Sequence, residues 1–198
     1  MSGYVLDWLR LGRVDLGLLY TAVEDRGLRT VSLLSEELVL FGPTTASDSL
    51  ALPPEGAVTL AVLAGHPLVL PSPGHGLRDQ LDEKASEQGF RLSPVTEIDA
   101  YASIKIMVEH GFGLSVLPAH AIGQEVAANR LRAWPFDPPL LRTVHLALPT
   151  DRPLSNAVRA IEGLCRTTLT QLVRSGAWGS AQMLVLTPAA ARPSSTLS

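Results

Sequence analysis

The feature that most constrains the fold is an alternation of short apolar runs with helical patterns between residues 67 and 118. Apolar runs bounded by proline or glycine predict buried strands at residues 67–71, 92–98 and 114–117. The two intervening helical patterns are carried by Leu77, Leu81 and Ala85, and by Ile104, Met107 and Val108. Strands that alternate with helices predict a parallel sheet with helices on its faces, and therefore an α/β fold.

Further elements are predicted on both sides of this region. Apolar spacing over residues 5–11 predicts a helix that ends at Gly12, and the run at residues 14–20 has the composition of a strand buried on both faces. Other strands are expected at residues 37–41, 131–136 and 143–148. The last helix is predicted from Leu154, with one apolar stripe made by Val158, Ile161, Leu164, Cys165, Thr168 and Leu172.

Composition excludes several classes of protein. Only 18% of residues are charged and the net charge is −3, so no face can collect enough Lys and Arg to bind nucleic acid by itself. The single cysteine, Cys165, excludes an internal disulfide framework and a cysteine-based zinc site. No apolar run approaches the roughly 20 residues that span a bilayer, and the first residues do not resemble a secretory signal. We therefore expect a soluble cytoplasmic protein without a membrane partner.

The segment Leu70–Asp79 is the most informative candidate site. It leaves a predicted strand, turns through two glycines and begins a helix, and free N–H groups at a helix start suit a carboxylate, phosphate or sulfate. The alternative is an ordinary strand–helix turn that binds water, and spacing alone does not decide between the two. The candidate ligand-binding residues here are Ser72, Gly74, His75, Gly76 and Leu77, with Arg78 as an additional charge.

A second candidate loop follows the strand expected at residues 92–98. Asp99, Ala100 and Tyr101 stand at the start of the next predicted helix, with Ser103 and Lys105 close behind. Because parallel strands place their carboxyl ends at one edge of a sheet, this loop is expected to face the same ligand as the first. The simpler alternative is that Asp99 only caps the helix.

The sequence gives little support for dinucleotide binding, metal binding or catalysis. Gly74 and Gly76 imitate the start of a dinucleotide-binding motif, but Asp79 stands where the third glycine belongs. The histidines show no metal-ligand spacing, and no nucleophile-elbow motif is present. Cys165 lies on an apolar stripe and is interpreted as a core residue. We expect no metal, no cofactor and no catalytic residues.

Seven segments carry a resemblance to a known family, namely residues 9–19, 34–40, 66–72, 97–100 with Ile104, 111–118, 142–147 and 152–157. In this order they resemble the effector-binding domain of LysR-type transcriptional regulators. The sequence of residues 71–78 is most similar to the nitrogen-assimilation-control branch of that family.

This resemblance implies a fold of two Rossmann-like α/β lobes, as in type 2 periplasmic binding proteins, joined by two crossover strands with a ligand cleft between them. The first lobe would comprise residues 1–43 and 150–176, the second residues 44–149, and residues 177–198 would form a disordered tail. The strand–helix–strand that opens the family's domain has no counterpart here, so the first lobe is expected to be incomplete.

The resemblance also implies a function. The family binds small metabolites in the cleft and passes the change to an N-terminal winged helix-turn-helix, so DNA would be bound only through a region outside this sequence. The full-length form would be a homodimer or tetramer. Two other functions stay open at this point: a solute-binding protein of a transport system, which shares the two-lobe plan, and a small α/β enzyme that binds phosphate at Gly74–Gly76.

Overall fold

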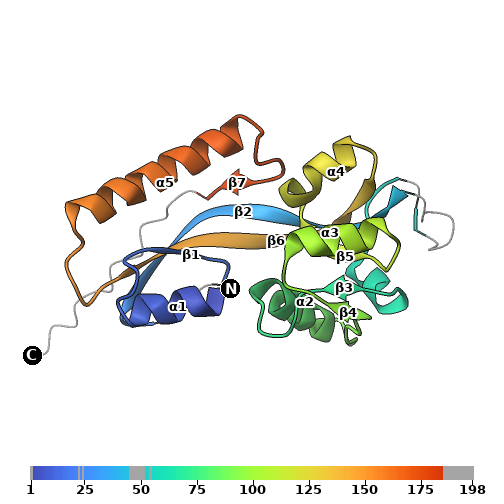
Figure 1. The fold of residues 1–198 in the computed structure, drawn as a ribbon, viewed down its shortest axis with the longest axis horizontal. Helices are drawn as coiled ribbons and strands as arrows, with labels where there is room; N and C mark the ends of the chain where they lie inside the picture. Colours follow the sequence, from blue (N-terminus) through green and yellow to red (C-terminus); the bar gives the residue numbers. More distant parts are fainter. Residues whose placement is uncertain (1, 22, 24, 45–51, 54, 185–198) are drawn as a thin grey trace, which may run out of the picture.

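Two long antiparallel strands form the centre of the molecule (Figure 1). The computed structural model describes residues 2–21, 23, 25–44, 52–53 and 55–184. Within them, β2 (Leu28–Pro43) pairs with β6 (Leu131–Pro149) along its whole length, from Leu28 opposite Pro149 to Pro43 opposite Leu131. The register shifts twice, between Ser32 and Leu34 and between Leu38 and Val39. This pair connects the two halves of the molecule.

Shorter strands extend this central pair on both sides. The main sheet has the order β1-β6-β2-β5, with β1 (Gly17–Leu19), β5 (Ser115–Pro118) and β7 (Gln182–Met183) all antiparallel to their partners. A second sheet is parallel and pairs β3 (Val69–Leu70) with β4 (Thr96–Glu97). It meets the main sheet through a parallel bridge between Leu68 and Leu114.

The helices divide between the two halves (Figure 1). At one end, α1 (Ser2–Arg10) and α5 (Asn156–Arg174) lie on opposite sides of the long strands. At the other end lie α2 (Gly76–Glu87), α3 (Tyr101–Glu109), α4 (Gly123–Ala127) and the short 3-10 helices Leu60–Gly65 and Ala119–Ile122.

Among the described residues, the buried apolar side chains form one large cluster and two small ones, and β2 and β6 contribute to all of them. The large cluster includes Phe41 and Trp134 from these strands, packed with Leu77 and Ile104 from α2 and α3. The two small clusters lie at the other end of the strands. Their members are Leu33, Leu34, Val144, Leu146, Leu148 and Leu169 in one, and Leu9, Leu19, Leu28 and Ala147 in the other.

The structure corrects three predictions about strands. Residues 131–136 and 143–148 belong to the one continuous strand β6, and the run at residues 37–41 is only part of β2. The strand at residues 17–19 is not buried on both faces, because Leu18 is 39% exposed on the edge of the sheet. The parallel sheet is limited to β3, β4 and single bridges, since the long crossing strands pair antiparallel with their neighbours.

The prediction for the last helix needs correction in its start and in its buried face. The helix begins at Asn156, where the Ser155 hydroxyl caps it by accepting a hydrogen bond from the backbone N–H of Val158 at 3.2 Å. On the predicted apolar stripe, Ile161 is 48% and Leu164 65% exposed. Periodicity identified the helix, but only its side around Leu169 meets the sheet among the described residues.

The expected disordered tail from residue 177 also differs from the structure at residues 177–184. The backbone N–H of Trp178 donates to the carbonyl of Leu172 at 3.0 Å, and β7 pairs with Leu34 and Ser35 of β2. Residues 185–198 lie outside the described residues. Among the helices that the structure describes, none combines the length and apolar character needed to cross a membrane.

Candidate functional site

The start of α2 is held in a defined turn. Gly74 has a φ of +83°, a backbone conformation that favours glycine, and its N–H donates to the carboxylate of Asp79 at 2.9 Å. His75 is the N-cap of α2, and its Nδ1 accepts the backbone N–H of Leu77 at 3.2 Å. The turn therefore directs the His75 side chain and the first amides of α2 toward the same region.

The start of α3 lies beside this turn and is linked to it. The backbone N–H of Ser72 donates to Asp99 Oδ1 at 2.9 Å, and this bond lowers the pKa of Asp99. Asp99 is not the cap of α3, contrary to the simpler sequence interpretation. The N-cap is Ala100, whose methyl group cannot accept a hydrogen bond, and the Asp99 carboxylate accepts from the Ser72 loop.

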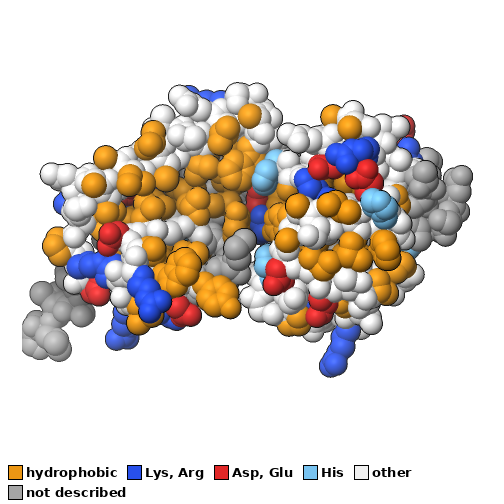
Figure 2. All heavy atoms as spheres, viewed as in Figure 1, with side chains coloured by type: hydrophobic (Ala, Val, Ile, Leu, Met, Phe, Trp, Pro, Cys, Tyr) orange, Lys and Arg blue, Asp and Glu red, His pale blue; other side chains and the backbone are white. Residues whose placement is uncertain are grey.

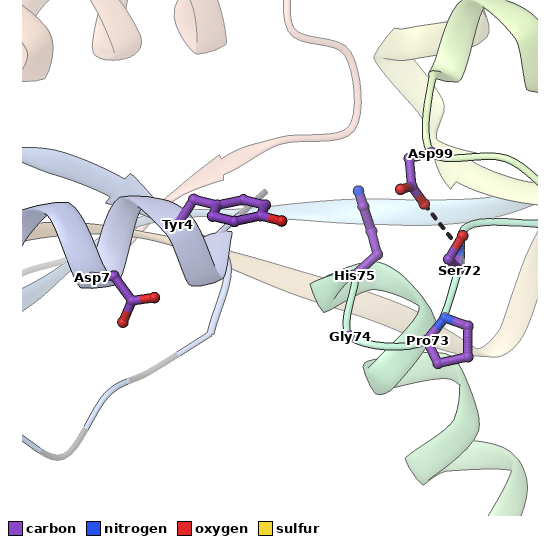
Figure 3. Close-up of a pocket in the computed structure, with 7 residues that line it drawn as sticks. All are labelled: Tyr4, Asp7, Ser72, Pro73, Gly74, His75 and Asp99. Carbon is purple, nitrogen blue, oxygen red and sulfur yellow. Dashed lines mark hydrogen bonds between the residues drawn. The ribbon is translucent and has the colours of Figure 1, made fainter.

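An outer cavity of about 370 Å³ lies between these two loops and α1. Figure 3 shows the Tyr4 side chain of α1 extending toward His75 on the opposite wall, while Ser72 and Asp99 are hydrogen-bonded to each other. Asp7 completes the α1 side of the lining. Because α1 and α2 belong to different halves of the molecule, this cavity lies where the halves meet.

An inner cavity of about 300 Å³ adjoins the outer one and shares His75 and Asp99 with it. One wall consists of the starts of α2 and α3, from Gly76 and Leu77 to Ala100 and Tyr101. The facing wall consists of Tyr20, which follows β1, and Arg142 of β6. The guanidinium of Arg142 lies over the Tyr20 ring, 3.9 Å from its centroid, in cation–π geometry.

Arg142 is held by a buried carboxylate. Its side chain is 3% exposed and donates from Nε and Nη2 to Oε1 of Glu36 on β2, and from Nη1 to the Tyr101 hydroxyl at 3.2 Å. Burial alone would lower the pKa of the Arg142 guanidinium, but the charge of Glu36 and the hydrogen bonds raise it. Arg142 therefore keeps its positive charge at the wall of the inner cavity.

The other oxygen of Glu36 contacts two further elements. Trp178 Nε1 donates to Oε2 at 3.0 Å, and His120 Nδ1 lies 3.2 Å from the same atom. Burial by itself would raise the pKa of Glu36, but hydrogen bonds from His120, Arg142 and Trp178 and the charge of Arg142 lower it. We call Glu36, Arg142, Tyr101, His120 and Trp178 the Glu36 network, which joins both long strands, α3 and the segment after α5.

Polar side chains also gather on the surface at the junction of the two halves. Figure 2 shows histidine and charged side chains where the two halves of the molecule meet, next to apolar surface that continues toward α5.

Burial lowers the pKa of His75, so its ring is kept neutral at the shared wall of the two cavities.

The eight main ligand-binding candidates from the sequence all line one of the two cavities, whereas Ser103, named beside them, lines neither. Ligand binding by them stays a prediction. Ser72 and Gly74 face the outer cavity, His75 and Asp99 face both, and the rest face the inner one, namely Gly76, Leu77, Ala100 and Tyr101.

Two secondary candidates are bonded elsewhere. Arg78 is buried and donates to Asp82 and Glu97, each at 2.8 Å, and to the carbonyl of Pro71. Lys105 contacts Glu125 at 2.7 Å and donates to the carbonyl of Ala121. Neither side chain lines the cavities described above.

The sequence interpretation missed Tyr20, Glu36 and Arg142. A signal for two of them was present, because Glu36 and Arg142 are charged residues inside long runs of strand-forming apolar residues. A charge in a buried strand needs a partner, so such a position suggests an ion pair or a site. Nothing in the local sequence indicates which residue is that partner.

Comparison with known proteins identifies the family. The family profile described as the LysR substrate binding domain matches residues 1–170. The chain belongs to this family. The finding confirms the resemblance stated from sequence and the α/β fold class with two Rossmann-like lobes crossed by two strands. It also favours a regulatory domain over a transport solute-binding protein.

Relatives of this LysR substrate-binding domain include transcriptional regulators. The regulator YeiE of Escherichia coli K12 is 31% identical over 77% of this chain and 51% of its own length. A probable nitrogen assimilation transcriptional activator of Synechococcus elongatus is 27% identical over 85% of this chain and 55% of its own length. The chain thus spans about half the length of the curated relatives it matches.

Solved structures of LysR regulatory domains share the fold of this chain. The effector-binding domain of QuiR in complex with shikimate has a TM-score of 0.72 at 17% identity, covering 85% of this chain and 78% of that one. A reduced form of OxyR from N. meningitidis has a TM-score of 0.72 at 20% identity, covering 92% and 80%. At these identities the likeness shows the fold of the LysR substrate-binding domain.

Proposed function

We propose that this chain is the ligand-sensing part of a LysR-type transcriptional regulator, and that its effector is a small molecule bound in the inner and outer cavities. The observation that carries the proposal is the convergence of two helix starts with Tyr20 and Arg142 around one cavity at the junction of the two halves. The start of α3 has no side-chain cap and Arg142 presents a charge, so the walls are suited to recognise a polar ligand.

The route from ligand to DNA is part of the same proposal. An effector that contacts both walls stabilises one arrangement of the two halves over another, because it binds that arrangement more tightly. This difference passes to a DNA-binding region outside these residues in a cytoplasmic, homodimeric or tetrameric full-length regulator. The lobe boundaries proposed are residues 1–43 with 150–176, and 44–149, with β2 and β6 crossing between them.

Turnover of the ligand is not part of the proposed function. Ser72, His75 and Asp99 share the outer cavity, which raises the question of a hydrolytic triad. A triad histidine donates its Nδ1–H to the carboxylate. In this chain Nδ1 of His75 accepts the backbone N–H of Leu77 instead, which supports a binding role.

The proposal is tested by ligand binding to the chain and to two variants. Calorimetric titration with small carboxylates and inorganic anions should identify a ligand, and Ser72→Ala and His75→Ala should each weaken it about fivefold, as expected for one lost hydrogen bond of about 1 kcal/mol. Ser93→Ala and His110→Ala are matched controls, because both residues are exposed and outside the cavities. Equal affinity of all four variants and the parent chain would show that the ligand binds elsewhere.

A further inference from the structure

Two side chains of the inner cavity, Arg142 and Tyr101, present hydrogen-bond donors. The hydrogen bonds of Arg142 to Glu36 and Tyr101 use three of the five guanidinium N–H groups. Two N–H groups of Arg142 therefore remain for a ligand. The Tyr101 hydroxyl accepts from Arg142, so its own hydrogen is also available to donate.

The starts of α2 and α3 add donors of a second kind to the lining. Because His75 Nδ1 accepts the N–H of Leu77, the neutral ring carries its hydrogen on Nε2. The N-cap of α3, Ala100, has no side-chain acceptor, so the first amides of that helix also remain as donors. A ligand group that meets Arg142, Tyr101 and these groups must accept hydrogen bonds, as a carboxylate does.

The remaining lining of the inner cavity is suited to a small apolar part of a ligand. Tyr20 and Tyr101 supply aromatic rings, and the exposed Ala100 supplies a methyl group. A volume of about 300 Å³ is at the lower end of the range for small-molecule sites. This space accommodates a single ring with one polar substituent.

Charge limits the ligand to one negative group. Asp99 lies at the boundary that both cavities share, and Asp7 lines the outer one. Arg142 is the single Lys or Arg among the residues that line the two cavities, and its two remaining N–H groups suit one carboxylate. A second anionic group on the ligand would face Asp99 and Asp7, and would have no further Lys or Arg among the residues that line the two cavities.

We propose that the ligand class is a small ring-bearing monocarboxylate, with its carboxylate on Arg142 and Tyr101 and its ring against Tyr20. This inference rests on the proposed function, since it specifies what the sensing cavity recognises. Arg142 and Tyr101 would then act as the residues that determine specificity. The Glu36 network holds Arg142 in place from behind, so the site is formed before the ligand arrives.

Probe molecules that differ in one property test the ligand class. The probes are benzoate and cyclohexanecarboxylate, the uncharged benzamide, and the dianion phthalate, each titrated into the chain by calorimetry. The two monocarboxylates should bind, and benzamide and phthalate should bind at least about tenfold more weakly, because one lacks the charge and the other carries a second one.

Two conservative variants locate the binding. Arg142→Lys keeps the positive charge beside Glu36 but loses the paired donors of the guanidinium, and should weaken benzoate binding about tenfold. Tyr101→Phe removes only a hydroxyl and should weaken it about fivefold. Arg132→Lys, on the same strand but outside the cavities, should leave benzoate affinity unchanged. Tyr101→Phe keeps the test decisive if Arg142→Lys does not fold.

The outcomes separate this inference from the function on which it rests. Equal binding of benzoate and benzamide, or benzoate binding unaffected by both variants, would overturn the ligand class. A thermal-shift screen that also contains amines, sugars and dicarboxylates provides the second arm. Stabilisation only by another class, lost in Tyr101→Phe, would overturn the ligand class and leave the sensing function standing. No stabilisation by any compound would count against both.

Discussion

At the scale of single residues, the decisive feature is a carboxylate buried in a strand. Glu36 is 1% exposed, and a charge removed from water is tolerated only when partners replace the water. Here the partners are Arg142, His120 and Trp178, which supply donors to both oxygens. The same arrangement fixes the guanidinium of Arg142 at the cavity wall, so stability and the proposed ligand recognition depend on one ion pair.

Replacing Glu36 should therefore be costly. Glu36→Gln leaves the buried Arg142 without its counter-charge and should lower the free energy of unfolding by about 3 kcal/mol. Urea denaturation measures the change. The control is Glu37→Gln, at the next position of β2, where the side chain is partly exposed and the expected change is below about 0.5 kcal/mol. Similar losses in both variants would contradict a special role for the ion pair.

At the scale of elements, the position of the candidate site depends on how β3 meets the segment that leads into β5. Val69 donates its N–H to the carbonyl of Leu114 at 2.9 Å, and Leu114 donates to the carbonyl of Pro67 at 2.8 Å. β3 leads directly into the Ser72 loop, so this contact helps to place the start of α2. Gly113 permits it, because a side chain there would meet the carbonyl oxygen of Pro67.

Alanine substitutions at two glycines test this close approach. Both Gly111 and Gly113 have positive φ, at +79° and +156°, so alanine is strained at either. At Gly111 nothing lies within 4 Å of a new Cβ, so we expect Gly111→Ala to lower the free energy of unfolding by only about 1 kcal/mol, from backbone strain. At Gly113 the Cβ would lie 2.5 Å from the Pro67 oxygen, so Gly113→Ala should lower the free energy of unfolding by at least about 1 kcal/mol more than Gly111→Ala. Thermal unfolding of the two variants compares them; equal melting temperatures would argue against the contact.

At the scale of the whole molecule, β2 and β6 are shared by both halves. Leu34 and Val144 belong to a small cluster at one end, while Phe41 and Trp134 belong to the large cluster at the other. Because β2 and β6 pair continuously, they connect the packing of one end to that of the other. The two ends are therefore expected to unfold together.

Hydrogen exchange tests this coupling. The backbone amides of β2 around Leu34 and around Leu40 lie in the two different ends, and their free energies of opening should agree within about 1 kcal/mol. Mass spectrometry of peptides from each end, in increasing urea, measures both values. A free energy of opening around Leu34 that is several kcal/mol lower than the value around Leu40 would show that the two ends unfold independently.

Local chemistry explains which parts were predictable from sequence. The helix starts at residues 76 and 101, and the loops before them, follow from glycine positions and short-range apolar spacing. The lengths of β2 and β6 did not follow, because their charged residues interrupt the apolar pattern that marks a buried strand. The buried face of α5 did not follow either, since periodicity describes a helix but not what packs against it.

The amino-acid sequence alone determined the family, the α/β class and the two loops that line the cavities. Only the tertiary structure decided what faces those loops. Glu36 and Arg142 are 106 positions apart, and Glu36 and Trp178 are 142 apart. Spacing rules describe neighbours along one element, whereas contacts at such separations exist only after the chain has folded.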